Sequence, residues 1–525
     1  MLLRNEHAGS FRFPLANVGK LGLEICQLEN ASGTRLDLQC FEQTLVSGGD
    51  LRISIDRSSG RNQYGTPQGK AEDEIWFSSC TAGAISSRGY AAALQAFEAI
   101  TQGGKAFAWF DRIRSRLAAL FGIKGSEIVL SGSGTELEYL ALFVARSILP
   151  LPLTNLVMAP GETGRGVLHA ASGRHFLSST SSGRTVERGT LLEGLELHEA
   201  AMETVEIRDK IGAPLSAEAI DDEVVRKVEA NIANNRCVLV HLLECSKTNL
   251  SGLRRSTASS LMARYAGRVA VVVDTCQLRC TAEQIRDDLR AGFMVMITGS
   301  KFAAGPPFAG ALLVPPRVLD QVHLFDLPNG LLSYTSAGDW PDGLRKRMRR
   351  QFGFPGNIGV GLRWEAALAE LEKLFALPIP FREAVAARFE DAIESHVRDD
   401  PMLELVDCRS AGSDLACRTI FPILTNERSS PRPLSSEAIY RSLRQPRLDA
   451  SCRRISRSAF HVGQPVAIGD RSALRICLSA SHVVDAAEKM TVEPIFEKAT
   501  APMIADVEAL FVKWAQLADE MSRCS

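Results

Sequence analysis

Short apolar segments alternate with longer amphipathic segments through the middle of the chain. Short, largely apolar segments occur at 155–160, 236–244, 269–274, 293–300 and 309–315. Helical periodicity appears between several of them, as at 256–267 and 281–292. Strands that are apolar at successive positions are buried on both faces, as in a mainly parallel sheet covered by helices. The pattern therefore predicts an α/β fold.

The pattern differs on either side of this region. Residues 1–72 contain short apolar pieces between turn-rich ones, which predicts an N-terminal appendage or arm. Residues 73–350 are predicted to form a large domain, with a strand, a glycine loop and a helix at 126–149. From residue 351 onward helices and strands mix, which predicts a smaller α+β C-terminal domain over 351–525.

Composition narrows the class of ligand. The chain has 525 residues, which is too long for one compact core. The net charge of −1 argues against a general binder of nucleic acid or anionic membranes, and so favours a small-molecule substrate. The first residues do not resemble a signal peptide and no apolar run is long enough to cross a membrane, so we expect a cytoplasmic protein. Cys276 and Cys280 lack a second pair at metal-ligand spacing, so no metal is expected.

Three groups of polar residues directly follow predicted strands. They are the loop Ser133–Gly134–Thr135, the carboxylate of Asp274, and Lys301 with Thr298 and Ser300 before it. Taken singly, each has a simple structural explanation: a glycine turn that caps a helix, an aspartate that caps a turn, and a surface lysine. The carboxyl ends of parallel strands meet at one edge of a sheet, so we expect the three groups to share a crevice.

Together the three groups fit one kind of ligand. The glycine loop at a helix N-terminus suits a phosphate, a carboxylate suits a protonated ring nitrogen, and a lysine suits an aldehyde. A cofactor with these three features is pyridoxal 5'-phosphate (PLP).

Four segments carry a more specific resemblance. They are "SGSGTE", "VVVDTCQ", "TGSKFAAGPPFAGALLV" and "FHVGQPVAIGDRSALRICLSA". With them the chain resembles fold-type I PLP-dependent enzymes, specifically the class V aminotransferase and cysteine desulfurase group, from about residue 75 to 490. The resemblance implies a large domain with a seven-stranded type of sheet. It also implies a homodimer with active sites near the subunit interface, because "QFGFPGNIGVG" resembles a loop that reaches the partner's cofactor.

The resemblance also implies roles for individual residues. Lys301 would form the Schiff base and Asp274 would pair with the ring nitrogen. Gln277 would contact the ring hydroxyl, and Arg475 would bind the substrate carboxylate. The phosphate would lie among Ser133, Gly134, Thr135, Thr298 and Ser300.

Two positions leave alternatives. The ring-stacking position falls on Glu162, Thr163 or Gly164, of which we favour Thr163, and this departs from the flat side chain common in the group. Lys247 is a rival for the Schiff base, but it lacks the downstream glycine-rich pattern.

The expected activity is a reaction of an amino acid through an external aldimine, with transamination first. A PLP-dependent lyase, by carbon–sulfur or side-chain cleavage, and an amino-acid decarboxylase are alternatives. Val462 stands where one branch of desulfurases has a persulfide-carrying cysteine, which disfavours persulfide chemistry. A catalytically silent scaffold is the remote alternative, and it is disfavoured because the lysine and the aspartate are both present.

Overall fold

The computed structural model describes residues 34–71, 73–150, 152–195, 200–322, 326–348, 352, 355–408, 418–428, 430, 432–446 and 458–524. Residues 1–33 and 72 of the predicted appendage lie outside the described residues. The same holds for Gln351, Gly353 and Phe354 of the segment expected to reach a partner subunit.

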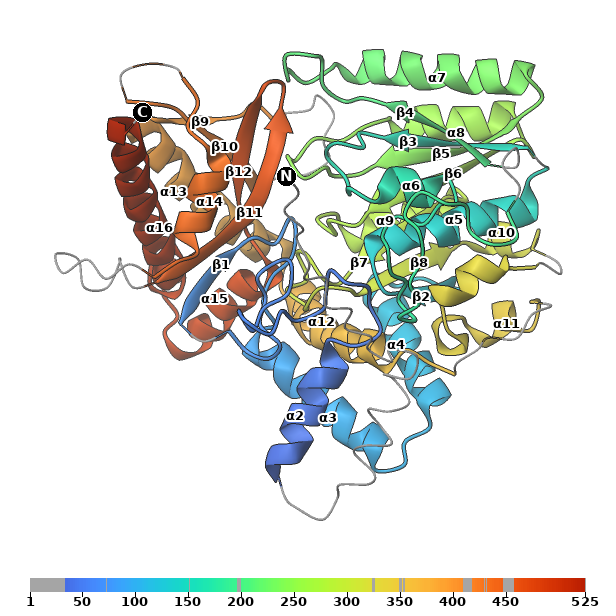
Figure 1. The fold of residues 1–525 in the computed structure, drawn as a ribbon, viewed down its shortest axis with the longest axis horizontal. Coiled ribbons are helices and arrows are strands. Elements are labelled where there is room, and N and C mark those ends of the chain that lie inside the picture. The colour runs from blue at the N-terminus through green and yellow to red at the C-terminus, as the bar shows by residue number, and fades with distance from the viewer. Residues whose placement is uncertain are drawn as a thin grey trace, which may run out of the picture.

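A seven-stranded sheet forms the larger lobe, on the right in Figure 1, with strand order β2-β8-β7-β6-β5-β3-β4. Its strands are β2 (Glu127–Ser131), β3 (Leu153–Met158), β4 (Ala200–Val205), β5 (Cys237–Leu243), β6 (Val269–Thr275), β7 (Met294–Thr298) and β8 (Gly310–Val314). β8 pairs antiparallel with both of its neighbours, whereas β4, β3, β5, β6 and β7 pair in parallel. The predicted α/β fold with a mainly parallel seven-stranded sheet is confirmed.

Helices cover both faces of this sheet. They include α5 (Gly134–Ile148), α6 (Val167–Ala171), α7 (Ala217–Ala233), α8 (Arg255–Arg264), α9 (Ala282–Arg290), α10 (Pro316–Leu319) and α11 (Asp342–Arg345). Successive residues of a strand point to opposite faces, so each strand supplies two cores. In β6, Val271 and Val273 belong to one hydrophobic cluster and Val272 to the other. This explains why the strands are apolar at successive positions rather than at every second one.

A five-stranded sheet of order β1-β11-β12-β10-β9 forms the smaller lobe. Its strands are β1 (Glu74–Phe77), β9 (Leu403–Leu405), β10 (Ile420–Thr425), β11 (Ala459–Ile468) and β12 (Arg471–Cys477). Its helices are α13 (Ile379–Asp399), α14 (Ser436–Leu443), α15 (Ala480–Val492) and α16 (Phe496–Cys524). β1 lies within the range expected for the large domain, yet it pairs with β11 of this sheet.

The long helix α12 (Ile358–Ala376) lies between the two lobes (Figure 1). It packs against α2 (Thr34–Leu45), α3 (Ser87–Thr101), α4 (Ala106–Phe121) and α15. Most of its side chains are buried, and Trp364 donates a hydrogen bond of 3.0 Å to the carbonyl of Gly310 at the start of β8. α12 therefore connects the beginning of β8 to the smaller lobe. In the part of the chain that the structure describes, no helix is long and apolar enough to cross a membrane.

Candidate active site

A cavity of about 350 Å³ opens at the carboxyl ends of β2, β3, β6 and β7. In open α/β sheets this edge is where ligands bind. The cavity wall includes all nine residues that the sequence assigned to a cofactor: Ser133, Gly134, Thr135, Thr163, Asp274, Gln277, Thr298, Ser300 and Lys301. Four separate strand ends thus bring these residues to one place.

The loop between β2 and α5 forms one end of the cavity. Ser133 is the N-cap of α5, and its side chain accepts a hydrogen bond of 3.3 Å from the backbone N–H of Glu136. A Cβ atom on Gly134 would lie 3.2 Å from Cys276 Sγ and 3.4 Å from the methyl group of Thr298. The missing side chain leaves the backbone N–H groups at the positive end of the helix open to an anion.

Arg52 also reaches this loop, although no pattern in the sequence pointed to it. Its guanidinium donates hydrogen bonds of 3.2 Å to Ser133 Oγ and to Thr135 Oγ1. It lies over the rings of Phe176 and Phe308, at 5.0 and 4.8 Å from their centroids. Asp50 binds it in an ion pair of 2.7 Å, which fixes the guanidinium where it lines the cavity. The loop therefore carries a positive charge in addition to its helix terminus.

Asp274 is the second-last residue of β6, and its carboxylate lines the cavity. Its Oδ1 accepts a hydrogen bond of 3.0 Å from the backbone N–H of Cys276. That bond holds the carboxylate at the end of the strand. A carboxylate fixed in this way can stabilise a protonated nitrogen on a bound ring.

A second acid, Glu138 of α5, lines the cavity beside Asp274. Burial and the charge of Asp274 raise the pKa of Glu138 well above its usual value. His241 lies 3.6 Å from it, and burial lowers the pKa of that imidazole to about 4. Burial thus disfavours the charged form of both Glu138 and His241 beside Asp274.

Lys301 follows β7 and lines the cavity. Among the described residues, no hydrogen bond or ion pair engages its amine. The nearby Gly299 is tightly enclosed, since a Cβ atom there would lie 2.6 Å from Ala367 Cβ in α12. The turn that carries Lys301 is thus fixed by contact with α12, while the amine itself stays available for reaction.

Gln277 and Thr163 both lie on the cavity wall, and hydrogen bonds hold their side chains to different extents. Gln277 Nε2 donates a hydrogen bond of 3.0 Å to the carbonyl of Cys80, and its Oε1 is buried with no partner in the described part of the chain. Thr163 makes a weak bond of 3.5 Å to the carbonyl of Pro160. Glu162, the less favoured neighbour, is engaged in an ion pair with Arg208 and accepts a hydrogen bond of 2.6 Å from Ser246.

Arg475 lies directly behind the cavity wall. It is 1% exposed, and its Nη2 donates to the side chain of Thr81 at 3.2 Å and to the carbonyl of Gln464. Thr81 and Gln464 both line the cavity. The Nε and Nη1 atoms of Arg475 are buried, and neither has a partner among the described residues. Such unsatisfied donors on a buried guanidinium are costly without an anion.

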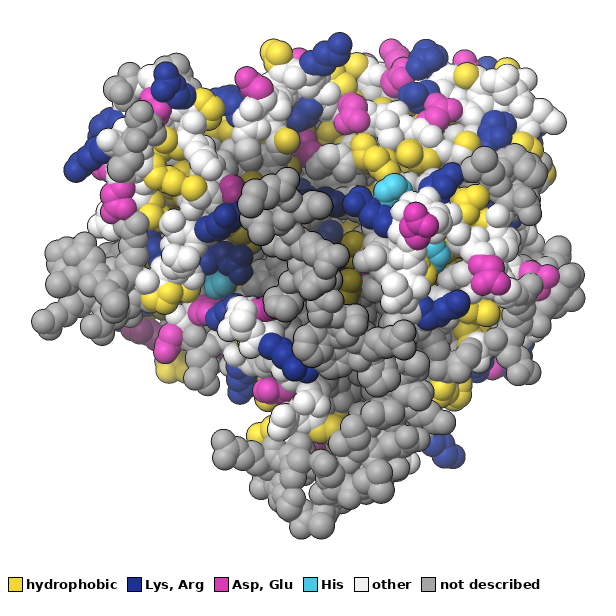
Figure 2. Space-filling model, in the orientation of Figure 1, with side chains coloured by type: hydrophobic (Ala, Val, Ile, Leu, Met, Phe, Trp, Pro, Cys, Tyr) yellow, Lys and Arg dark blue, Asp and Glu magenta, His cyan; other side chains and the backbone are white. Residues whose placement is uncertain are grey.

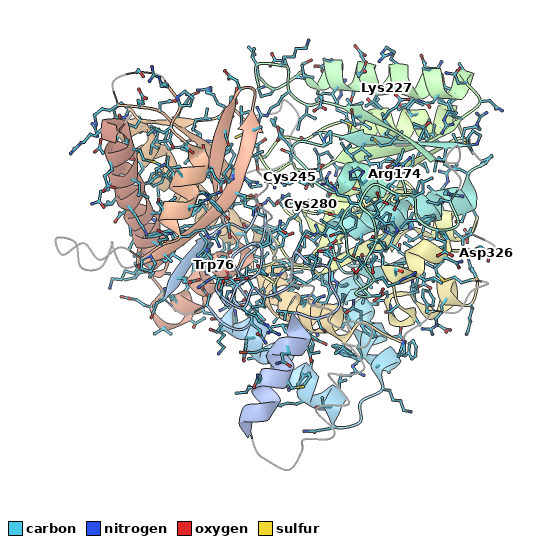
Figure 3. All side chains as sticks on the ribbon, viewed as in Figure 1. Trp76, Arg174, Lys227, Cys245, Cys280 and Asp326 are labelled. Carbon is cyan, nitrogen blue, oxygen red and sulfur yellow. The ribbon has the colours of Figure 1, made fainter. Side chains whose placement is uncertain are left out.

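The cavity wall also contains thiols to which the sequence assigned no role at the site. Cys80, Cys245 and Cys276 line it, and Figure 3 labels Cys245 between the two lobes. Burial raises the pKa of Cys80, but a hydrogen bond with Cys477 and the charges of Arg475 and Arg279 bring it down to about 5. The scattered positions of these cysteines in the sequence concealed that they meet at the site.

No protein-family profile matches the chain, and no curated protein matches it in sequence. Solved structures match its fold. Alanine–glyoxylate aminotransferase from Nostoc sp. has a TM-score of 0.52 and 13% identity over 85% of this chain and 96% of its own. A C-DES variant with glycine covalently linked to its PLP cofactor gives 0.51 and 13%, over 83% and 96%. The cysteine desulfurase CsdA from Escherichia coli gives 0.50 and 14%, over 86% and 96%.

These likenesses extend over both lobes of the chain. They show that it has the fold of fold-type I PLP-dependent enzymes, as the sequence predicted. At identities of 13 and 14% they carry the fold and no residue assignments. The roles of the site residues therefore depend on the contacts within the cavity.

Proposed function

We propose that this chain is a PLP-dependent enzyme that acts on an amino acid, most simply as an aminotransferase. One observation carries the proposal: an amine, a carboxylate and an anion-binding helix N-terminus line the same cavity. They belong to Lys301, Asp274 and the Ser133–Thr135 loop, which are separate in sequence. PLP has a chemical partner for each of them.

The residues fit the cofactor at each of its three features. The phosphate would lie at the open backbone of Gly134, with the hydroxyls of Ser133 and Thr135 and the guanidinium of Arg52 around it. Asp274 would hold the ring nitrogen, and the free amine of Lys301 would hold the aldehyde carbon. The fold shared with PLP-dependent enzymes supports this fit.

When bound, PLP supplies an electron sink for the bond that breaks at the substrate Cα. Asp274 would keep the ring nitrogen protonated through its charge. The Lys301 amine would remove and return a proton at the substrate Cα. Positioned acid–base groups of this kind contribute about 10²–10⁴ in rate. Arg475 would bind the α-carboxylate through Nε and Nη1, the two nitrogens that lack a partner among the described residues.

Lyase activity is the second candidate, and the thiols at the wall favour it over decarboxylation. Binding of the α-carboxylate by Arg475 is compatible with transamination and elimination, in which that carboxylate stays on the substrate. Decarboxylation instead requires the carboxylate to leave as carbon dioxide. A PLP-containing C-DES variant and a cysteine desulfurase are among the structures that share the fold, alongside an aminotransferase.

Two experiments test the proposal. The purified protein supplied with PLP should show the visible absorption of a lysine-bound cofactor, and Lys301→Ala should not. Absence of that absorption in the unmodified protein would contradict the proposal. Incubation with single amino acids, followed by detection of keto acid, amine, ammonia or sulfide, then identifies the reaction. Keto acid formed without ammonia supports transamination, and absence of any product supports a silent scaffold.

The proposal includes a cytoplasmic homodimer with its active sites near the subunit interface. It is supported by the likeness of "QFGFPGNIGVG" to a loop that reaches a partner subunit in this group of enzymes. Light scattering of the purified protein tests the assembly, and a monomer mass at micromolar concentration would contradict it.

A further inference from the structure

Positively charged side chains outnumber the negative ones around the cavity. Figure 2 shows several Lys and Arg side chains near the centre of this face of the molecule. The charged residues that line the cavity are Arg52, Arg165, Arg188, Lys247, Lys301, Glu138, Glu162 and Asp274. What matters for binding is which of these charges are already neutralised within the protein.

The acids leave little negative charge in the cavity. Glu162 is buried and paired with Arg208, which lies outside the wall. Burial and the neighbouring carboxylate of Asp274 raise the pKa of Glu138 well above its usual value, which favours its neutral form. Asp274 and the Cys80 thiol, whose pKa is lowered to about 5, then supply the remaining negative charge, and under the proposed function Asp274 is committed to the cofactor nitrogen.

Two of the cations are committed as well. Arg52 is paired with Asp50 and directed at Ser133 and Thr135, where the cofactor phosphate would lie. Lys301 would be joined to the cofactor. Three cations then remain over the rest of the cavity: Lys247, Arg165 and Arg188.

Lys247 is the most enclosed of these three. It is half-buried, whereas Arg165 and Arg188 are exposed at the rim. In the part of the chain that the structure describes, no carboxylate pairs with any of the three. The backbone of Lys247 is fixed, because its N–H donates a hydrogen bond of 3.1 Å to the carbonyl of Glu162. Burial, together with the charges of Arg475 and Lys301, lowers the pKa of this amine to about 7.

A surplus of cations in a partly enclosed site is unfavourable until an anion enters. The α-carboxylate of an amino acid would satisfy Arg475 alone, through its two unpartnered nitrogens. We therefore infer that Lys247, with Arg165 and Arg188 at the rim, forms a second anion-binding subsite for the side chain of the substrate. The substrate class is an α-amino acid whose side chain ends in a carboxylate, a phosphate or a sulfonate. This inference rests on the proposed function.

Binding is measured through the absorbance of the lysine-bound cofactor. Each anionic amino acid is compared with its neutral counterpart: aspartate with asparagine, glutamate with glutamine, phosphoserine with serine, and cysteate with serine. We expect at least one anionic member to half-saturate the change at about a tenfold lower concentration than its counterpart, since a hydrogen bond to a charged group is worth about that much. The pair with the largest ratio identifies the anion.

Substitutions of Lys247 then locate the subsite. Lys247→Met should reduce the preference for the anionic member about tenfold, and Lys247→Arg, which keeps the charge, should retain most of it. Lys124→Met is the matched control, because Lys124 is exposed on a loop and does not line the cavity. It should leave the preference unchanged.

Three outcomes separate the ideas. If every neutral counterpart binds as well as its anionic partner while the cofactor absorption is present, the inference is wrong and the proposed function stands. If Lys247→Met weakens both members of a pair equally, Lys247 shares the α-carboxylate with Arg475, and the second subsite is again excluded. Absence of the cofactor absorption in the unmodified protein contradicts the proposed function itself.

Discussion

Arg52 and Thr135 lie 83 positions apart in the chain, and a hydrogen bond of 3.2 Å joins the guanidinium of the first to the hydroxyl of the second. The same guanidinium contacts Ser133, so one side chain spans the loop that opens α5. Asp50 holds it there, and the rings of Phe176 and Phe308 lie against it. A segment that precedes both lobes in sequence thus completes one end of the cavity.

Arg52→Ala should weaken cofactor binding. The substitution removes a cation from the place where the phosphate would lie, and charge-assisted hydrogen bonds to phosphate are worth about 1.5–3 kcal/mol each. We expect the dissociation constant for PLP to rise by about tenfold or more. Titration of the cofactor-free protein, followed by absorbance or fluorescence, measures the change.

Arg52→Lys and Arg112→Ala complete that comparison. Lysine keeps the charge but cannot bridge Ser133 and Thr135 with a planar fork, so an intermediate loss is expected. Arg112 is exposed on α4 and should be without effect. Equal affinity for PLP in Arg52→Ala and the unmodified protein would show that Arg52 has no part in holding the phosphate.

Asp274→Asn should retain the cofactor and lose most of the turnover. Asparagine can keep a hydrogen bond to Cys276 N, as Asp274 Oδ1 does at 3.0 Å, but it has no charge to keep a ring nitrogen protonated. Loss of a fixed electrostatic contact in an active site costs about 10²–10³ in kcat. Steady-state kinetics with the best amino acid, alongside cofactor content from absorbance, gives both quantities.

Near-normal kcat in Asp274→Asn with full cofactor content would refute the role of this carboxylate. Loss of cofactor and turnover together would instead assign Asp274 to binding. The neighbouring Glu138 provides a comparison, because burial and the charge of Asp274 raise its pKa well above the usual value, and Glu138→Gln should lower kcat far less.

Much of the larger lobe follows from the sequence because its strands are buried on both faces. Val271, Val272 and Val273 serve two different cores, so the strand has no polar position and is easily recognised. The placement of Asp274 and Lys301 follows as well, because polar residues directly after such strands must lie at the sheet edge. These inferences depend only on local sequence and on the geometry of parallel sheets.

Long-range contacts of irregular segments are different. Arg52 lies in a turn-rich stretch without periodicity, so nothing in its sequence neighbourhood points to Ser133. From the sequence, Lys247 is only a rival for the Schiff base, and its lack of an acidic partner among the described residues becomes visible only in three dimensions. The preference for Thr163 over Glu162 stays a prediction, although the engagement of Glu162 with Arg208 is consistent with it.

Glu136→Gln should stabilise the protein increasingly as pH rises. Burial, and next the charge of Asp50, raise the pKa of Glu136 to about 8. A group with a raised pKa in the folded state contributes stability below its unfolded pKa, near 4.5, and that contribution is lost as pH rises toward 8. Glutamine has no such loss, so its advantage should grow from pH 5 to 8 by up to about 1.4 kcal/mol per pH unit.

Thermal unfolding of both proteins at pH 5, 6, 7 and 8, saturated with cofactor, checks this sign. The glutamine introduced by Glu136→Gln can still accept the hydrogen bond from Ser181 through its carbonyl oxygen. Glu98→Gln, on the exposed side of α3, should give a difference that does not change with pH. A constant or shrinking difference for Glu136→Gln would mean that Glu136 is charged in the folded protein.

The preference for an anionic side chain should itself depend on pH through Lys247. With a pKa of about 7 in the cavity, the amine is charged below pH 7 and loses its proton above it. The preference should therefore be constant below about pH 7 and fall above it, by as much as about tenfold per pH unit. The measurement is the ratio of the half-saturating concentrations of the anionic amino acid and its neutral counterpart, taken between pH 6 and 9. Titrations that affect both amino acids of a pair, such as that of the substrate amine, cancel in this ratio.

Lys247→Arg identifies the titrating group. Its guanidinium stays charged throughout this range, so the ratio should become flat between pH 6 and 9 while the preference itself persists. If the ratio in Lys247→Arg falls with the same midpoint as in the unmodified protein, a group other than Lys247 is titrating. That group is not Cys80, because its pKa of about 5 lies below the range that is measured. Arg165 and Arg188 remain charged in both proteins. If the preference of the unmodified protein does not change with pH, the anionic side chain is therefore bound by these two arginines and not by Lys247.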